Sequence, residues 1–120
     1  MCIFFTTVAG VIHLYIFCLE SLVWGRAKTN RVFGISSEIA EHNRLFAFNQ
    51  GFYNLFLAMA ALGGLVIGIN NVVGKTLVAY ALISMILAAV VLIFSNRKLI
   101  RPALVQGIPP LAGLALLAFY

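Results

Sequence analysis

Long apolar segments alternate with short polar ones along this chain. The apolar segments cover residues 3–24, 45–69, 76–94 and 103–120, and each is long enough to cross a bilayer as a helix, which needs about 20 apolar residues. Transmembrane barrel strands would be about 10 residues long with alternating polarity. Lipid admits only helices or closed barrels. The pattern therefore predicts an all-α bundle of four transmembrane helices.

The composition agrees with a chain embedded in the lipid bilayer. Of its 120 residues, 63% are hydrophobic and 9% are charged, whereas about a quarter of the residues of a soluble domain are charged. We expect residues 1–120 to form one integral membrane domain.

The basic residues are distributed unevenly between the connections. Seven of the eight lie in the first connection (25–44) and the third (95–102), and only Lys75 lies in the second. Cytoplasmic loops carry the excess of Lys and Arg. The chain is therefore expected in the inner (cytoplasmic) membrane, with both termini on the outer side. Nucleic-acid binding would need a contiguous basic face, so no nucleic-acid partner is expected.

The first connection contains a helix-start signal. Ser36-Ser37-Glu38 combines capping residues with an acid in the first turn, which predicts a short helix over 38–44 leading into the second span. Glu38, Glu41 and His42 have metal-ligand spacing, but a solvated helix face is the preferred interpretation, so no metal is expected.

Glu20 is the most unusual residue, because it is ionisable and lies inside the first apolar segment. Burying such a side chain in a membrane costs on the order of 2.5–3.5 kcal/mol, and residues that bear this cost are usually paired and functional. His13 precedes it by seven residues and shares its helix face. These two residues are the candidates for acid–base chemistry, and no reaction is identified.

Amide side chains are expected at similar depths on other helices. Counted from the ends of the apolar segments, Asn49, Gln50 and Gln106 lie level with Glu20, and Asn54 lies level with His13. We expect spans one, two and four to converge on Glu20, with Asn49 or Gln50 and Gln106 reaching its carboxyl directly or through one water. Tyr53 shares a face with Asn49. The expected ligand-binding set is Glu20, His13, Asn49, Gln50, Tyr53, Asn54 and Gln106.

Two further features concern the second and fourth spans. Pro109 and Pro110 cannot donate to the carbonyls four residues earlier, so those carbonyls are left free beside Gly107. Free carbonyls of this kind are typical of a site. Ala60, Gly64 and Gly68 form a small-residue stripe; packing within the bundle is preferred over a homo-oligomer interface.

Several stretches resemble a known family: residues 13–24, Phe33-Gly34, residues 47–58 and residues 106–109, with Asn49-Gln50-Gly51-Phe52-Tyr53-Asn54 the most specific block. They are similar to the small bacterial membrane proteins of the domain-of-unknown-function family numbered 1304. The resemblance implies a four-span membrane protein and supplies no list of catalytic residues.

The preferred functional hypothesis is the binding of a lipid-like or amphipathic small molecule at an intramembrane polar site. The alternatives are proton-coupled transport of a small molecule, hydrogen bonding by Glu20 that only holds helices together, and a structural subunit of a membrane complex. The one-sided distribution of basic residues argues against the transporters that insert in both orientations. The cofactor is unknown.

Overall fold

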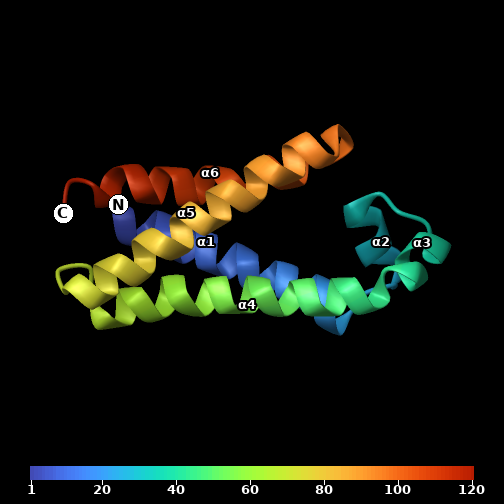
Figure 1. Cartoon of the computed structure of the whole chain (residues 1–120), viewed down its shortest axis with the longest axis horizontal. Helices are drawn as coiled ribbons and strands as arrows, with labels where there is room; N and C mark the ends of the chain where they lie inside the picture. The colour runs from blue at the N-terminus through green and yellow to red at the C-terminus, as the bar shows by residue number, and fades with distance from the viewer.

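The computed structural model describes all 120 residues, which form helices and no strands (Figure 1). The elements are α1 (Cys2–Phe17), the π-helical turn η1 (Cys18–Leu22), α2 (Ala27–Phe33), α3 (Ser37–His42), α4 (Arg44–Ile67), α5 (Val72–Ser95), the 3-10 turn η2 (Arg97–Leu99) and α6 (Ile100–Leu117). Four stretches are long and apolar enough to cross a membrane: Cys2–Leu22, Arg44–Ile67, Val72–Ser95 and Arg97–Leu117. The prediction of an all-α bundle with four such helices is confirmed.

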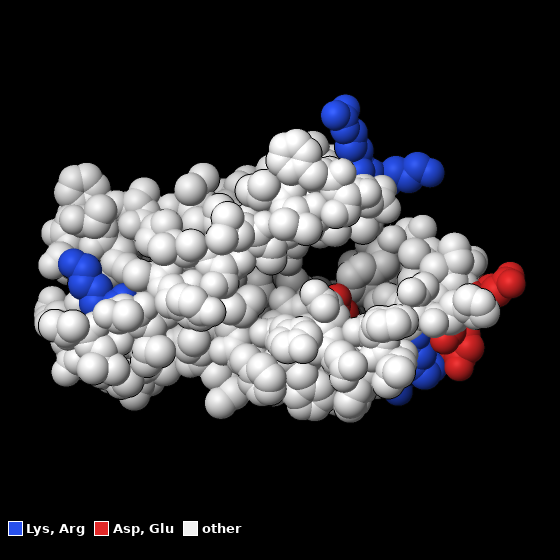
Figure 2. Space-filling view, viewed as in Figure 1, with Lys and Arg blue, Asp and Glu red and all other residues white.

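The bundle has two unlike ends. Both termini lie at one end, which we call the termini end, beside the α4–α5 turn and the first turn of α5 with Lys75 (Figure 1). The opposite, basic end contains residues 25–44 and 96–101, which carry the other seven Lys and Arg residues. Figure 2 shows that charged side chains gather near the ends and that the face between them is almost free of charge. This distribution is typical of a chain whose middle lies in lipid.

The tightly packed core lies toward the termini end. α1 packs against α4 and α6, and α5 packs against the same two helices. The core side chains are mostly small or aliphatic, and they come from all four long helices and the α4–α5 turn: Cys2, Ala9, Ala61, Ile69, Val78, Ala81, Leu82, Met85 and Leu117. Small residues allow helix backbones to approach closely in a membrane protein.

The small-residue stripe of α4 is used within the chain at Gly64. A Cβ at this position would lie 2.8 Å from the carbonyl oxygen of Gly74 and 2.8 Å from Cγ2 of Val78. Gly64 therefore packs directly on the first turns of α5, as the preferred interpretation of the stripe expects.

The structure corrects the connection between the first two spans. The first span ends at Leu22, before the predicted 24, and α2 was not predicted at all. The predicted helix over 38–44 is α3, which begins at Ser37 and ends at His42. Ser36 caps it by accepting a hydrogen bond from the Ile39 amide at 3.2 Å. Asn43 then separates α3 from α4, with φ −103° and ψ 8°.

At the basic end, α5 and α6 separate from α4. In Figure 1 the last turns of α5 rise away from α4, and in Figure 2 the surface is hollowed between these turns and the α2–α3 segment, with acidic atoms at the edge of the hollow. α6 stays close to α5, since a Cβ at Gly107 would lie 2.9 Å from the Cβ of Ala89. Gly107 therefore serves α5–α6 packing.

Candidate functional site at Glu20

A π-helical turn carries Glu20. Over Cys18–Leu22 the chain leaves the α-helical pattern, and the amide of Val23 donates to the carbonyl of Cys18, five residues earlier, at 3.0 Å. π-helical turns are rare, and this one ends the first helix, because Val23 after it is no longer helical. Glu20 is half-buried in this turn.

Gly51 allows α4 to approach this turn closely. A Cβ on Gly51 would overlap Oγ of Ser21 and lie 3.1 Å from the Cβ of Glu20. The Ser21 hydroxyl donates to the carbonyl of Phe48 at 2.8 Å. These contacts hold the Glu20 backbone against α4.

Asn54 is the hydrogen-bond partner of Glu20. Its Nδ2 donates to Oε2 of Glu20 at 2.9 Å and to the carbonyl of Gln50 at 3.1 Å. The structure contains one ion pair, between Arg44 and Glu41, so no cation of the chain pairs with Glu20. Its carboxyl keeps Oε1 free for a further donor.

The direct hydrogen-bond partner of Glu20 is not one of the amides expected to reach it. No direct hydrogen bond joins the side chains of Asn49, Gln50 or Gln106 to its carboxyl, and Asn54 takes that place. The expected depths take residues 24 and 45 as level. In the structure Gly51 lies against Ser21, which places Glu20 nearly two turns inside the start of α4.

The remaining α4 candidates divide between two sides of the helix. Asn49 and Tyr53 are exposed and lie across α4 from Gly51, the residue that faces α1. Gln50 is also exposed, but it lies one turn from Asn54 on the same side. Gln106 is half-buried on α6. The structure therefore brings Glu20 and Asn54 together and leaves Asn49 and Tyr53 on the outer side.

His13 lies deeper than Glu20 in the bundle. Its side chain is 1% exposed, its Nδ1 lies 2.9 Å from the carbonyl of Ala9, and its Nε2 has no partner. Since a carbonyl only accepts, Nδ1 carries the proton and Nε2 is the free acceptor. Seven residues of helix separate His13 from Glu20 by roughly 10 Å, which excludes a direct hydrogen bond.

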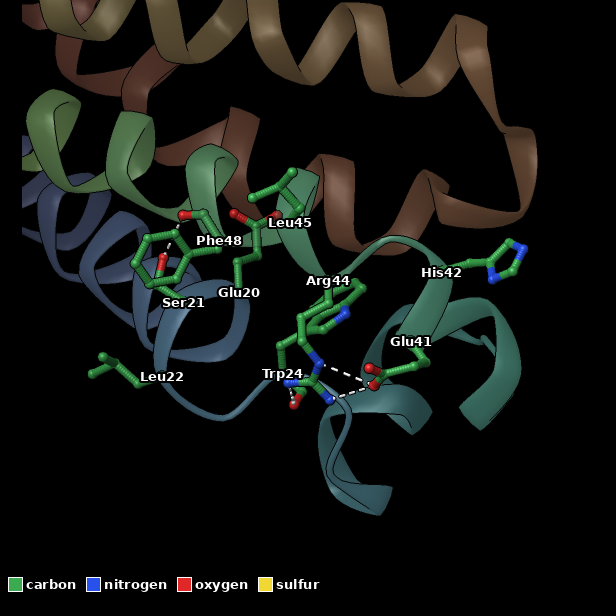
Figure 3. A pocket seen from close by; sticks show the side chains of 9 residues that line it. All are labelled: Glu20, Ser21, Leu22, Trp24, Glu41, His42, Arg44, Leu45 and Phe48. Carbon is green, nitrogen blue, oxygen red and sulfur yellow. Dashed lines mark hydrogen bonds and ion pairs between the residues drawn. The ribbon is translucent and has the colours of Figure 1, made fainter.

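A cavity of about 480 Å³ adjoins Glu20 at the basic end (Figure 3). Its lining combines an acidic and a hydroxyl side chain, four apolar side chains and three residues of the α3–α4 junction: Glu20, Ser21, Leu22, Trp24, Leu45, Phe48, Glu41, His42 and Arg44. In Figure 3 the Glu20 carboxyl points away from Trp24 and Arg44, and His42 points outward. The cavity therefore has the Glu20 carboxyl at one side, apolar side chains beside it, and the Glu41–Arg44 ion pair in its lining.

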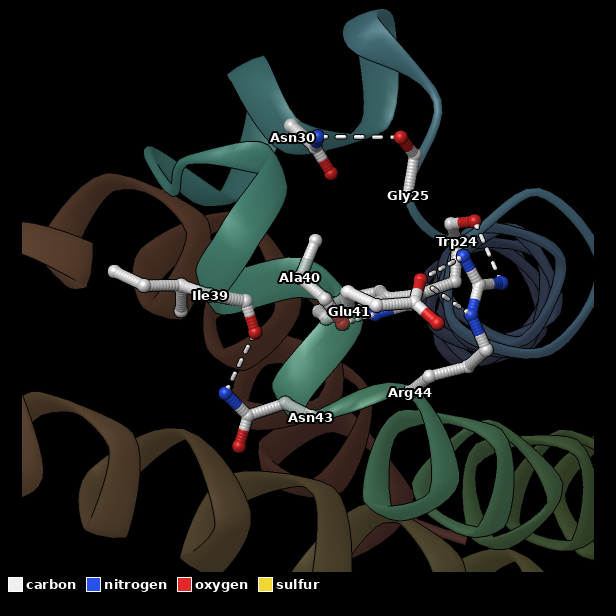
Figure 4. A network of polar contacts seen from close by, with 8 residues as sticks. All are labelled: Trp24, Gly25, Asn30, Ile39, Ala40, Glu41, Asn43 and Arg44. Carbon is white, nitrogen blue, oxygen red and sulfur yellow. Dashed lines mark hydrogen bonds and ion pairs between the residues drawn. The ribbon is translucent and has the colours of Figure 1, made fainter.

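Residues that the sequence did not assign to the site close one side of this cavity (Figure 4). Trp24 Nε1 donates to the carbonyl of Ala40 at 2.7 Å, and Arg44 Nη1 donates to the carbonyl of Trp24 at 3.3 Å. Arg44 also binds Oε2 of Glu41 through Nε at 3.0 Å and through Nη2 at 2.8 Å. The i, i+3 spacing of Glu41 and Arg44 is the one sequence signal for this network.

Arg44 changes the acidity of Glu41. The hydrogen bonds from its guanidinium, together with its positive charge, hold the pKa of the Glu41 carboxyl below its usual value. Glu41 is therefore ionised at neutral pH and keeps Arg44 engaged at the mouth of the cavity.

A family model described as "Protein of unknown function (DUF1304)" matches residues 7–118. The chain belongs to the DUF1304 family. No curated protein and no solved structure matches it. The region shared with the DUF1304 model includes His13, Glu20, Asn54 and Gln106, so the whole candidate site lies within the family domain.

Proposed function

We propose that this DUF1304 protein binds a lipid-like or amphipathic small molecule at Glu20. The observation that carries the proposal is a carboxyl within a candidate span that has one amide donor and no cationic partner, beside a cavity lined in part by four apolar side chains. Carboxyl groups in membrane-spanning segments commonly mark the binding paths of ligands or ions. The chain is a multi-pass membrane protein, and we place it in the cytoplasmic membrane with the basic end inside.

The lining indicates the chemistry of the molecule. Oε1 of Glu20 accepts hydrogen bonds, so a head group with an ammonium or hydroxyl donor fits it best. Phe48, Leu45 and Trp24 offer apolar surface to an alkyl chain. Asn54 orients the carboxyl, and we include Gln50 and Gln106 as candidate amides for the remaining polar groups. No reaction is proposed.

Binding is favoured over proton-coupled transport by the packing beyond the cavity. A transport path must reach both sides of the membrane. Toward the termini end the four helices close around side chains such as Val78, Leu82 and Met85, each 0% exposed. The cavity at Glu20 opens at the basic end, which suits a binding site entered from that side.

The proposal is tested with amphiphiles that share one chain length. The protein, in phosphatidylcholine nanodiscs, is titrated with dodecylamine, dodecanol and dodecanoate, and binding is followed by the fluorescence of Trp24, the single tryptophan. We expect the amine to bind most tightly and the carboxylate most weakly. Glu20→Gln is expected to abolish the preference for the amine.

Glu38→Gln is the matched control. It removes the same charge at the basic end, but Glu38 is exposed on α3 and does not line the cavity. It should leave the titration unchanged. Equal binding of the amine by the parent and by Glu20→Gln would refute the proposed function.

A further inference from the structure

A second hollow lies on the other side of α1, between its basic end and α2. Its volume is about 480 Å³, and it shares no lining residue with the cavity at Glu20. Three lining residues come from α1 and the chain directly after it, and five from α2 and its cap: Tyr15, Leu19, Val23, Arg26, Ala27, Lys28, Thr29 and Val32. We refer to this hollow as the α1–α2 groove.

Side-chain hydrogen bonds fix α2 beside the end of α1. The Thr29 hydroxyl donates to the carbonyl of Val23 at 2.9 Å, and Nδ2 of Asn30 donates to the carbonyl of Gly25 at 3.2 Å. Gly25 has a φ of 86°, in the left-handed region that favours glycine, so the chain can reverse there. The α1–α2 groove is therefore a built feature of the fold.

The α1–α2 groove has an apolar part and a basic part. Tyr15, Leu19 and Val23 follow one another at four-residue spacing, so they form a stripe along one side of the helix end. Arg26 and Lys28 are exposed at the end of this stripe, neither is in an ion pair, and no acidic residue lines the groove. Tyr15 and Leu19 lie within the first candidate span, which ends at Leu22, and the two cations follow that end by a few residues.

We infer that the α1–α2 groove binds an anionic phospholipid. The phosphate group would meet Arg26 and Lys28, and an acyl chain would run along Leu19 and Tyr15. Charge complementarity supports this occupant, because two unpaired cations follow the end of the first candidate span and the adjoining wall is apolar. Basic residues next to a membrane span attract anionic lipids. This site differs in charge from the acidic cavity at Glu20, and it does not depend on the function proposed there.

The inference is tested by native mass spectrometry of protein released from vesicles of equal parts phosphatidylglycerol and phosphatidylcholine. The parent should retain phosphatidylglycerol in preference to phosphatidylcholine. The double variant Arg26→Gln/Lys28→Gln should lose this preference by between roughly 5- and 30-fold, since each basic residue near an anionic surface contributes about fivefold. Glu38→Gln, which lines neither hollow, should retain the lipid as the parent does.

Arg97→Gln/Lys98→Gln is the matched control, because it removes two exposed cations at the same end but outside the groove. It should behave as the parent, whereas an equal loss would show general surface attraction and overturn the inference. Tyr15→Ala keeps both cations but removes apolar surface from the groove, so it should weaken the retention of phosphatidylglycerol. Soluble glycerol phosphate should not compete; full competition would show a free-phosphate site and would also overturn the inference.

Discussion

Glu20 and Asn54 share one hydrogen bond across the α1–α4 interface, and substitutions at Glu20 separate its structural role from its chemical role. Glutamine keeps the volume and an acceptor oxygen, so Glu20→Gln should unfold at nearly the parent temperature. Leucine removes the acceptor and leaves the Asn54 amide with the Gln50 carbonyl alone. Losing the partner of a buried polar group lowers the free energy of unfolding by about 1–3 kcal/mol. Because Asn54 keeps its hydrogen bond to the Gln50 carbonyl, we expect the loss in Glu20→Leu to lie near the lower value.

Thermal unfolding in detergent measures both variants of Glu20. A Glu20→Leu protein that melts above the parent would contradict a stabilising role for the hydrogen bond. If the amine titration is unchanged as well, Glu20 neither holds the helices together nor anchors a ligand.

Gly51 tests the close approach of α4 to the π turn. In Gly51→Ala the new methyl group would overlap the Ser21 hydroxyl, so we expect a loss of about 1–3 kcal/mol, as in other overpacked cores. Gly63→Ala is the control on the same helix, because a Cβ there meets no atom within 4 Å. It should be neutral or stabilising by up to about 1 kcal/mol through helix propensity. Equal unfolding temperatures for the two variants would contradict the close approach.

At the scale of elements, the contact of α3 with the end of α1 should depend on pH. Arg44 lowers the pKa of Glu41 below its ordinary value of 4.5, so the folded state binds this proton less readily than the unfolded state. The contribution of the pair is therefore complete above about pH 4.5 and is lost as the pH falls through the lowered pKa. The carbonyl of Trp24 binds Arg44. We therefore expect acrylamide to quench the fluorescence of Trp24 more strongly only when the pH falls below about 4.5.

Glu41→Gln separates this pair from the other acids. Because the glutamine side chain cannot ionise, acrylamide quenching of Trp24 in this variant should already be raised at neutral pH. It should change little on acidification. Arg44→Gln should show the same raised quenching. A parent-like pH profile in Glu41→Gln would assign the change to Glu20 or Glu38 instead.

At the scale of the whole molecule, the orientation in the membrane can be tested by labelling. In a background of Cys2→Ala and Cys18→Ala, single cysteines are placed at Arg31, exposed at the basic end, and at Asn70, exposed at the termini end. The excess of basic residues predicts that a membrane-impermeant maleimide labels position 70 in intact cells and reaches position 31 only after lysis. Labelling of position 31 from outside would reverse the proposed topology.

Much of the architecture follows from local features of the sequence. The lengths of the apolar segments predict four spans, because the thickness of the bilayer and the need to satisfy backbone hydrogen bonds act on each segment by itself. The cap at Ser36 was also predictable, since it depends on residues three apart. Glu20 was recognisable as a site candidate because a charged group in an apolar segment is costly wherever the other helices lie.

The partners of Glu20 were decided only by the tertiary structure. Whether Asn49 or Asn54 reaches the carboxyl depends on the register of α4 against α1, which Gly51 sets by admitting the π turn. The Trp24–Ala40 and Arg44–Trp24 hydrogen bonds likewise join residues 16 and 20 positions apart. Hydrophobic length determines which segments cross the membrane, whereas the contacts between helices depend on side-chain shapes that meet only after the helices have packed.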